Sequence, residues 1–368
     1  MTTNSLSDSI WRKLIKDFNA PICHINAINS TRIVYHAQQL GLTQNTDKMV
    51  KWVGFLSKLE PVKQEAFMGL TRDVMDSMID HVLNSEGYKE GFNKVDLQKE
   101  MPLVQMNIPT GDVFNNTNIG KCFISLDLQE AAFQAFHFWD IIKNYPNILP
   151  GGGISSYKEW VEYTIENIAH EDPIKQEMLL VDYIREQIVE YLQDSKQIRQ
   201  VIFGKTNPKR IQHVEKWIVQ GMVERIREDV GVLPVRLNND EAIYEFSEEL
   251  EKWVLDTFKG TDFPAHLHVT KFELRAGRLV QTAIITLDNM KFNGPLVFCL
   301  VRSEAKGGQW VDKDTKFKCL PTRFGYMFEA LYKGYLKESE YFAAQPTLAE
   351  GYVTYIQRPN VTWKLEMI

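Results

Sequence analysis

Apolar side chains recur at helical spacing through the first hundred residues. Phe67, Leu70 and Val74 follow one another every three or four positions, which is the period of one helix face. Pro61 precedes this stripe, and proline is favoured in the first turn of a helix. Residues 1 to about 100 are therefore predicted to be helical, with these side chains packed in a core.

The centre of the chain alternates short apolar runs with longer helical stretches. The run KCFISL, residues 121–126, predicts a short strand that ends at Asp127, and the apolar-rich segment 128–139 predicts a helix. Further helices are predicted from periodicity and, for two of them, from an opening proline, over residues 157–168, 173–192 and 208–227.

A β-hairpin is predicted near residue 240. A mostly apolar run leads into NNDEAIYEF, residues 238–246, where Asp240 and Glu241 lie at the break between two strand-like segments. Rigid strands fix the oxygens of carboxylates at such a turn, which suits the binding of a hard cation. Strands are also predicted downstream, over residues 266–275, 281–287 and 295–301.

Composition narrows the class of protein. The 368 residues are 44% hydrophobic and 24% charged, which is typical of a globular protein with a full core. No run of about 18 apolar residues occurs, so no membrane partner is expected. The four cysteines are widely scattered without metal-ligand spacing, which favours a reducing, cytoplasmic location.

The balance of charge gives a mixed indication of partners. The net charge of −6 counts mildly against a nucleic-acid binder. Residues 196–210, KQIRQVIFGKTNPKR, nevertheless carry five basic side chains and no acidic one. Such a run is either a solvated helix face or a local anion-binding surface, and both interpretations stay open.

Asp127 and Asp240 are candidates for phosphoryl-transfer chemistry. Each follows an apolar strand-like segment, and carboxylates from two strands can together hold the two divalent ions that clamp attacking and leaving oxygens. The alternative is that either aspartate merely caps a helix or a turn. His266 and His268 would share one strand face, but no third metal ligand is evident, which favours structural histidines.

Three short motifs resemble those of family A, DNA polymerase I-like nucleic-acid polymerases. SLDLQEAAFQAF, residues 125–136, is similar to the palm motif that contains DYSQIELR, and IRQVIFGKTNP, residues 198–208, is similar to the fingers-helix motif AKAINFGLIYG. Asn239, Asp240 and Glu241 fall on the HDE of the third motif. The motifs occur in family order, and the resemblance covers roughly residues 121–277.

The resemblance implies a site. Asp127 and Asp240 would bind two Mg²⁺ ions, with Mn²⁺ as an alternative, and Glu241 would support them. The residues implied in nucleotide binding are the triphosphate contact Arg199, its neighbours Lys196 and Lys205, Phe203 beside the nascent pair, and Ala132 at the position of the sugar-gating glutamate. A small residue at Ala132 predicts tolerance of ribonucleotides. The implied partners are a primer–template and nucleoside triphosphates.

The expected architecture is α+β, a polymerase palm with a helical N-terminal lobe and short fingers. The predicted parts are a lobe over 1–115, a palm over 116–278 with fingers inserted at about 150–207, and an α/β extension over 279–368. Departures from the family pattern include Asn207 in place of the fingers tyrosine and a short segment between Arg199 and Asp240, which indicates trimmed fingers.

The expected function is that of a compact, magnesium-dependent DNA polymerase in replication, of a kind that suits a phage or virus and, in that case, the host cytoplasm. Two alternatives remain. One is a catalytically degenerate palm that acts as a nucleic-acid-binding replication scaffold, which the shortened fingers favour. The other is a template-independent terminal transferase.

Overall fold

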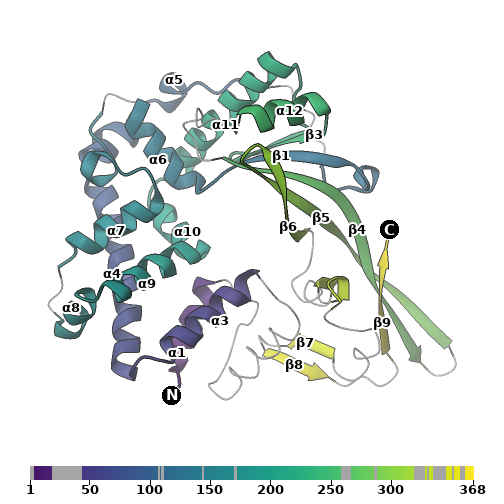
Figure 1. Cartoon of the computed structure of the whole chain (residues 1–368), viewed down its shortest axis with the longest axis horizontal. Coiled ribbons are helices and arrows are strands. Elements are labelled where there is room, and N and C mark those ends of the chain that lie inside the picture. The colour runs from purple at the N-terminus through teal and green to yellow at the C-terminus, as the bar shows by residue number, and fades with distance from the viewer. Residues whose placement is uncertain are drawn as a thin grey trace.

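A computed structural model describes the chain over residues 4–18, 44–106, 108, 112–142, 145–169, 172–257, 267–285, 288–318, 328–329, 331–334, 345–349, 352–356 and 361–368. The fold is α+β, as predicted: helices gather on one side and a long antiparallel sheet arches away from them (Figure 1). None of the described helices combines the length and apolar character that a membrane span requires.

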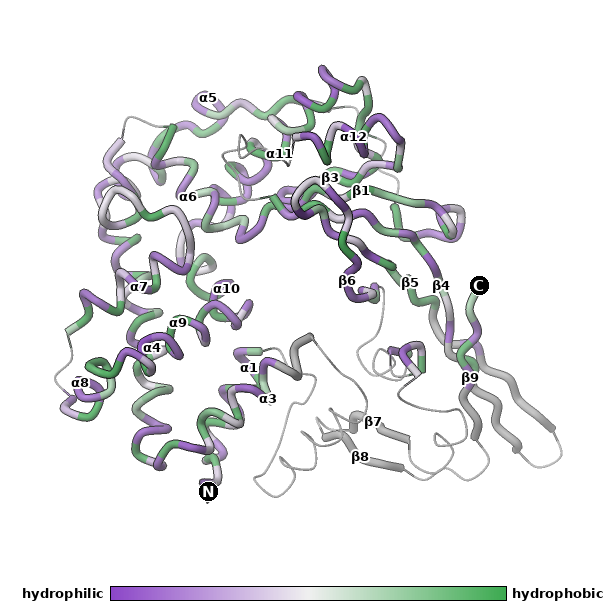
Figure 2. The backbone as a smooth tube through the Cα atoms, viewed as in Figure 1, coloured by the Kyte–Doolittle hydropathy of each residue, from purple (hydrophilic) through white to green (hydrophobic). Residues whose placement is uncertain are grey.

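The helices before the first strand lie on the helical side (Figure 1). They are α1 (Asp8–Asp17), α3 (Gln44–Leu56), α4 (Pro61–Asn84), the π-helix η1 (Gly87–Phe92) and α5 (Leu97–Glu100). The predicted stripe on α4 is confirmed, because Phe67, Leu70 and Val74 are fully buried. Figure 2 shows hydrophobic and hydrophilic residues alternating along these helices, as expected of helices with one face in a core.

The remaining helices follow the first strand. They are α6 (Ala131–Ile142), α7 (Tyr157–Asn167), α8 (Pro173–Leu179), α9 (Asp182–Asp194), α10 (Lys196–Lys205), α11 (Pro208–Val230) and α12 (Glu248–Thr257). Short 3₁₀ turns lie at Asn116–Asn118 and Pro150–Gly152. α4 packs against α7, α8, α9 and α10. Buried side chains from helices that precede and helices that follow the first strand in the sequence form a single hydrophobic cluster.

The single helix predicted over 173–192 is wrong, because the segment forms two helices. Leu180 is 83% exposed and Val181 has an extended backbone, so the apolar stripe has no core to bury against at this point. Asp182 then opens α9, where its negative charge is favourable in the first turn.

β1 (Cys122–Leu128), the strand predicted to end at Asp127, lies inside the sheet between β3 and β4. Its strand order is β2-β3-β1-β4-β5-β6, and every pairing is antiparallel. The other strands are β2 (Arg236–Leu237), β3 (Glu241–Glu245), β4 (Leu267–Ile285), β5 (Asp288–Lys306), β6 (Gln309–Lys318), β9 (Val361–Met367), which pairs with β4, and a separate hairpin of β7 (Gln345–Ala349) with β8 (Tyr352–Ile356).

The predicted hairpin is confirmed in β2 and β3, although its first strand is short. Arg236 pairs with Ile243, and Leu237 pairs with Ala242. The strands predicted over 266–275 and 281–287 are parts of one long strand, β4, which runs through residue 278. The strands β5 and β6 extend the same sheet, so the residues beyond 278 are continuous with those around Asp127.

The two faces of the sheet have different environments. Ile124, Leu126 and Tyr244 point to the helical side and join the main cluster, where α11 packs against α6 and β3. Phe123 and Phe272 belong to the opposite face, which carries a smaller apolar cluster together with polar side chains. This alternation is the period of two along a strand.

We predict opposite effects from one substitution at two helical glycines. At Gly87, an added Cβ would lie 1.9 Å from the carbonyl oxygen of Pro146, so Gly87→Ala should lower the free energy of unfolding by about 1–3 kcal/mol. Gly221, exposed on α11, has nothing within 4 Å of such a Cβ, so Gly221→Ala should raise it by about 0.5–1 kcal/mol. Urea unfolding measures both, and equal effects would contradict the packing at Gly87.

Candidate active site

Asp127 and Glu241 lie side by side on neighbouring strands. They are register partners, because β1 pairs with β3 so that Asp127 faces Glu241 and Ser125 faces Ile243. Partners in an antiparallel pair share one face, with Cβ atoms about 4.5–5.5 Å apart. The two carboxylates therefore occupy the sheet face that does not pack on the helices.

Local hydrogen bonds hold the hairpin turn against the end of β1. The Ser125 hydroxyl donates to a carboxylate oxygen of Glu241 at 2.7 Å, and the side-chain amide of Asn238 lies 3.4 Å from the other oxygen. The backbone N–H of Leu128 donates to the carbonyl oxygen of Asp240 at 2.8 Å. Asp240 is exposed, and this bond ties its backbone to the strand that carries Asp127.

Asp127 is not a helix cap. Glu130 directly precedes α6, and its carbonyl accepts hydrogen bonds from the N–H groups of Phe133 and Gln134. Glu130 has φ +56°, the only positive φ of a non-glycine among the described residues. Backbone strain of this kind concentrates at functional sites. Here the left-handed conformation of Glu130 turns the chain from β1 into α6, three residues after Asp127.

Burial and neighbouring carboxylates raise the proton affinity of Asp127 and Glu215. Burial raises the pKa of Asp127 to about 7, with further contributions from Glu241 and Asp240, while Lys316 and Lys196 oppose the rise. Burial, followed by the charge of Asp240, also raises the pKa of Glu215 on α11 to about 7. Negative charge is thus concentrated here beyond what nearby cations balance, which is typical of functional sites.

A small cavity of about 40 Å³ lies beside these carboxylates on the open sheet face. Its acidic side is formed by Asp127 and Glu241. Its basic side is formed by residues of β5 and β6, namely Arg302, Lys316 and Lys318. The motif-based interpretation of the sequence missed these three residues, whose only signal is basic side chains at alternate positions of a strand, Lys316 and Lys318.

His268 extends the polar row across the sheet. It is the β4 register partner of Asp127, and its Nε2 lies 2.7 Å from Glu304 and 2.9 Å from the ammonium of Lys313. Burial, followed by the charge of Lys313, lowers its pKa, and Glu304 opposes this. His266 lies outside the described residues. Over the described part of the chain, no group of three or more His, Cys, Asp or Glu residues is placed to hold a metal ion.

Helix α10 brings one basic side chain toward the carboxylates. Lys196, exposed at the first position of α10, lowers the pKa of Asp127 by its charge. Arg199 donates a hydrogen bond to the carbonyl oxygen of Gln193, and its guanidinium lies 5.8 Å from the ring centre of Tyr157. Lys205 is exposed at the far end of the helix, about 14 Å along the axis from Lys196.

Two other predicted nucleotide contacts are packed in the protein. Phe203 is only 7% exposed, and its ring contacts those of Phe136 at 5.8 Å and Trp160 at 6.1 Å between centroids. Ala132 is half-buried in α6 and packs against the same cluster. Tyr244, a side chain of β3, is buried on the sheet face opposite Asp127.

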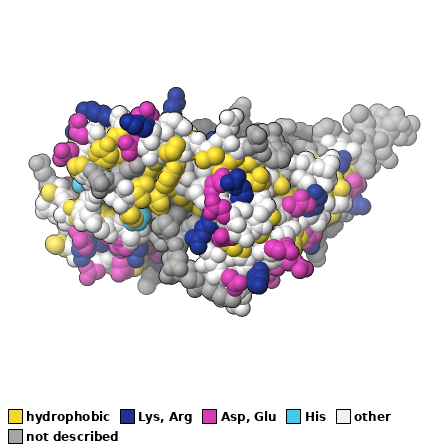
Figure 3. All heavy atoms as spheres, turned by 90° about the horizontal axis from the view of Figure 1, so that it is seen from above, with side chains coloured by type: hydrophobic (Ala, Val, Ile, Leu, Met, Phe, Trp, Pro, Cys, Tyr) yellow, Lys and Arg dark blue, Asp and Glu magenta, His cyan; other side chains and the backbone are white. Residues whose placement is uncertain are grey.

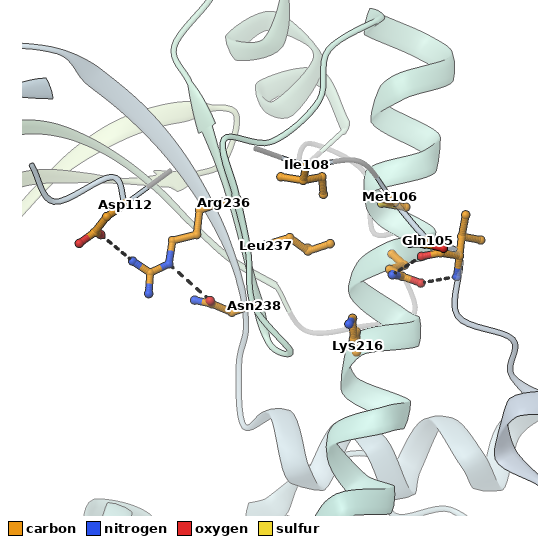
Figure 4. Close-up of a pocket in the computed structure, with 10 residues that line it drawn as sticks. Gln105, Met106, Ile108, Asp112, Lys216, Arg236, Leu237 and Asn238 are labelled. Atoms are coloured by element: carbon orange, nitrogen blue, oxygen red, sulfur yellow. Dashed lines mark hydrogen bonds and ion pairs between the residues drawn. The ribbon is translucent and has the colours of Figure 1, made fainter. Parts of the chain in front are cut away.

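A larger pocket of about 570 Å³ lies between the hairpin and α11 (Figure 4). In it, Arg236 lies between Asp112, at 3.2 Å, and the side-chain oxygen of Asn238, at 3.4 Å. Lys216 projects from α11 into the same space. Leu237 and Asn238 of the hairpin line this pocket, while Asp127, Asp240 and Glu241 do not.

Positive and negative side chains are mixed on the visible surface. Figure 3 shows Lys and Arg next to Asp and Glu over the described residues of that face, without one continuous field of either sign. On this face, any attraction of an anionic partner must therefore come from local clusters.

We predict that neutralising Asp127 stabilises the protein above neutral pH. The raised pKa means that the folded state holds a proton that the unfolded state releases, so the contribution of Asp127 to stability falls as pH rises from about 4 to about 7. Asp127→Asn should therefore raise the free energy of unfolding by about 2–4 kcal/mol at pH 8 and by little at pH 4.

Urea unfolding in EDTA at the two pH values measures this difference. Glu228→Gln, on the exposed surface of α11, is the matched control and should show no such pH-dependent gain. An Asp127→Asn protein that is destabilised equally at both pH values would contradict the burial of an unbalanced carboxylate.

We predict that Phe203 acts through the core. Phe203→Ala should lower the free energy of unfolding by about 3–5 kcal/mol, because it empties a buried aromatic position. The adjacent Gly204→Ala should leave stability unchanged or slightly raised, since nothing lies within 4 Å of the added Cβ. Thermal unfolding of both variants is the measurement, and a Phe203→Ala protein as stable as the parent would instead indicate a surface role.

Comparisons with known proteins gave no match. A scan against protein-family models, a search of curated proteins and a search of solved structures each found nothing that matches this chain. The site itself combines carboxylates at adjoining strand ends with basic side chains of β5, β6 and α10.

Proposed function

We propose that this chain is a metal-dependent nucleotidyltransferase that extends a nucleic-acid primer along a template, as a compact relative of family A polymerases. The observation that carries the proposal is the meeting of Asp127 and Asp240 at adjoining strand ends, with Glu241 beside them. Two aspartates far apart in the sequence come together only through the pairing of β1 with the hairpin. Helices on one sheet face, with Asp127 and Glu241 on the other, also agree with a palm.

The carboxylates suit magnesium despite their small number. Mg²⁺ is usually held by one or two carboxylates together with substrate phosphates and waters, so a site without three protein ligands fits this ion. Asp127 and Asp240 would be its ligands, and Glu241, fixed by Ser125, would orient the turn. When bound, such ions polarise the phosphate oxygens and orient the attacking and leaving groups.

Lys196 is the best candidate for a triphosphate contact. Its charge acts on Asp127, so it would balance charge that develops on a transferred phosphoryl group. Arg199 lies one turn further along α10 and would first have to release the carbonyl oxygen of Gln193. Lys205, at the other end of α10, is too distant along the helix to share one triphosphate with Lys196.

Sugar selection follows from the first turn of α6. The side chain of Ala132 ends at Cβ, so it offers no bulk to exclude a 2′-hydroxyl, and a pocket that merely tolerates an added hydroxyl rejects it poorly. We propose that ribonucleotides are accepted with less than about a hundredfold disadvantage.

A binding scaffold without catalysis is the second candidate. The short segment between Arg199 and Asp240 favours it, because that segment leaves little chain for fingers that grip a template. A scaffold would keep nucleic-acid binding and would not incorporate nucleotides under any metal condition.

The test is extension of a labelled primer with Mg²⁺, on a template and as a bare single strand. Templated addition supports a polymerase, addition to the bare strand alone indicates a terminal transferase, and the absence of addition with binding retained indicates the scaffold. Asp127→Ala and Asp240→Ala should each abolish incorporation, and the double variant should be little worse than either, because one loss already removes most of the site.

Controls separate chemistry from folding. Glu228→Gln should extend the primer at the parental rate, and each variant must show a cooperative thermal transition. Substantial incorporation by either aspartate variant would overturn the assignment of the two carboxylates.

A further inference from the structure

Three cations line the open sheet face beside Asp127. Arg302 on β5 is the register partner of Phe272, while Lys316 and Lys318 on β6 pair with Leu300 and Phe298. All three basic side chains line the cavity that contains Asp127 and Glu241. They come from the C-terminal part of the sheet, to which neither motif nor resemblance gave a role.

The three cations are not paired directly with carboxylates among the described residues. Lys316 has no hydrogen-bond or ion-pair partner among the described residues. The Lys316 residue as a whole is exposed to solvent, but protein atoms surround part of its side chain. This partial burial lowers the pKa of Lys316, and the charges of Lys318 and Arg302 lower it further. Arg302 donates to the backbone carbonyl of Asp314 at 3.0 Å, and neither it nor Lys318 forms a described ion pair.

An aromatic ring lies within the same surface. Phe114 is half-buried, and its ring centre is 5.5 Å from the ammonium of Lys318 and 5.6 Å from the guanidinium of Arg236. Its other neighbour is the ring of Phe298, 6.2 Å away. Sites for single-stranded nucleic acids combine a basic groove with aromatic rings on which bases stack, and this surface has both components.

The spacing also suits a strand of phosphates. Lys316 and Lys318 are two positions apart on one strand, which places them on one face about 7 Å apart, comparable to successive phosphates of an extended nucleic-acid strand. Asp127 and Glu241 repel phosphate at one end of the row, so the strand would approach from β6 and end near the carboxylates.

We infer that Arg302, Lys316, Lys318 and Phe114 form a binding surface for a single nucleic-acid strand. The choice of ligand rests on the proposed function, since a strand held here would present its end to Asp127. The lysines hold backbone phosphates, and Phe114 stacks on an unpaired base. Arg236, paired with Asp112, also lies against the ring of Phe114.

Fluorescence anisotropy with a labelled oligo-dT, in EDTA and at several salt concentrations, tests the inference. The variant Lys316→Gln with Lys318→Gln should bind at least about tenfold more weakly, and its salt slope should fall by about 1.4, that is about 0.7 per lost phosphate contact. The control, Lys58→Gln with Lys99→Gln, makes the same charge change on exposed lysines of the helical side and should leave the slope unchanged.

Phe114 separates stacking from charge. Phe114→Leu keeps apolar contact with Phe298 and should weaken binding roughly five- to a hundredfold without changing the salt slope. The same oligonucleotide annealed into a duplex should lose this sensitivity, because its bases are paired. If the control pair Lys58→Gln with Lys99→Gln lost as much affinity as Lys316→Gln with Lys318→Gln, the proposed phosphate contacts would be overturned. An unaltered affinity of Phe114→Leu would overturn the proposed stacking.

The inference and the proposed function fail separately. Asp127→Asn should bind oligo-dT at least as tightly as the parent, because it removes a repelling charge. A chain that binds the strand through Lys316 and Lys318 and incorporates no nucleotide would exclude the polymerase and keep the surface. If the variant with Lys316 and Lys318 replaced extended primers and bound oligo-dT with parental affinity, the binding surface would be excluded and the polymerase proposal would remain.

Discussion

The pairing of β1 between β3 and β4 is the constraint on which the rest of the site depends. This register sets Asp127 opposite Glu241 on one side and opposite His268 on the other. A shift of one residue would turn Asp127 toward the helices and bury Ile124 on the wrong face, so the hydrophobic cores on both faces specify the register strongly. The same apolar packing that stabilises the sheet therefore determines which carboxylates meet.

That arrangement concentrates charge where the folded protein does not balance it. Burial and two neighbouring carboxylates raise the pKa of Asp127 to about 7, while the cations of β5 and β6 stand on the other side of a small cavity. A structure selected for stability alone would pair these groups directly or replace them. Proteins keep unfavourable groups of this kind where function requires them, because a bound ligand then supplies the missing charge.

The helical side provides a rigid support for this face. α6 begins directly after β1, and α11 packs against α6 and β3, so both strands that carry the carboxylates rest on helices of one core. α10 belongs to the same core through Phe203 and presents Lys196 toward Asp127. Catalytic and binding groups are positioned most accurately on strands and helices held in this way.

The sequence by itself determined the local features: the strand that carries Asp127, the hairpin that carries Asp240 and Glu241, and the amphipathic helix α4, because periodicity and turn residues act over a few neighbouring positions. Only the tertiary structure decided that Phe203 belongs to a core, that residues 173–192 form two helices, and that Arg302 and Lys316 line the cavity beside Asp127. These outcomes depend on strand register and on which surfaces find a partner. Such long-range contacts leave no pattern in the spacing of residues along one segment. The strands that pair are far apart in the chain, and their packing is determined only in the folded protein.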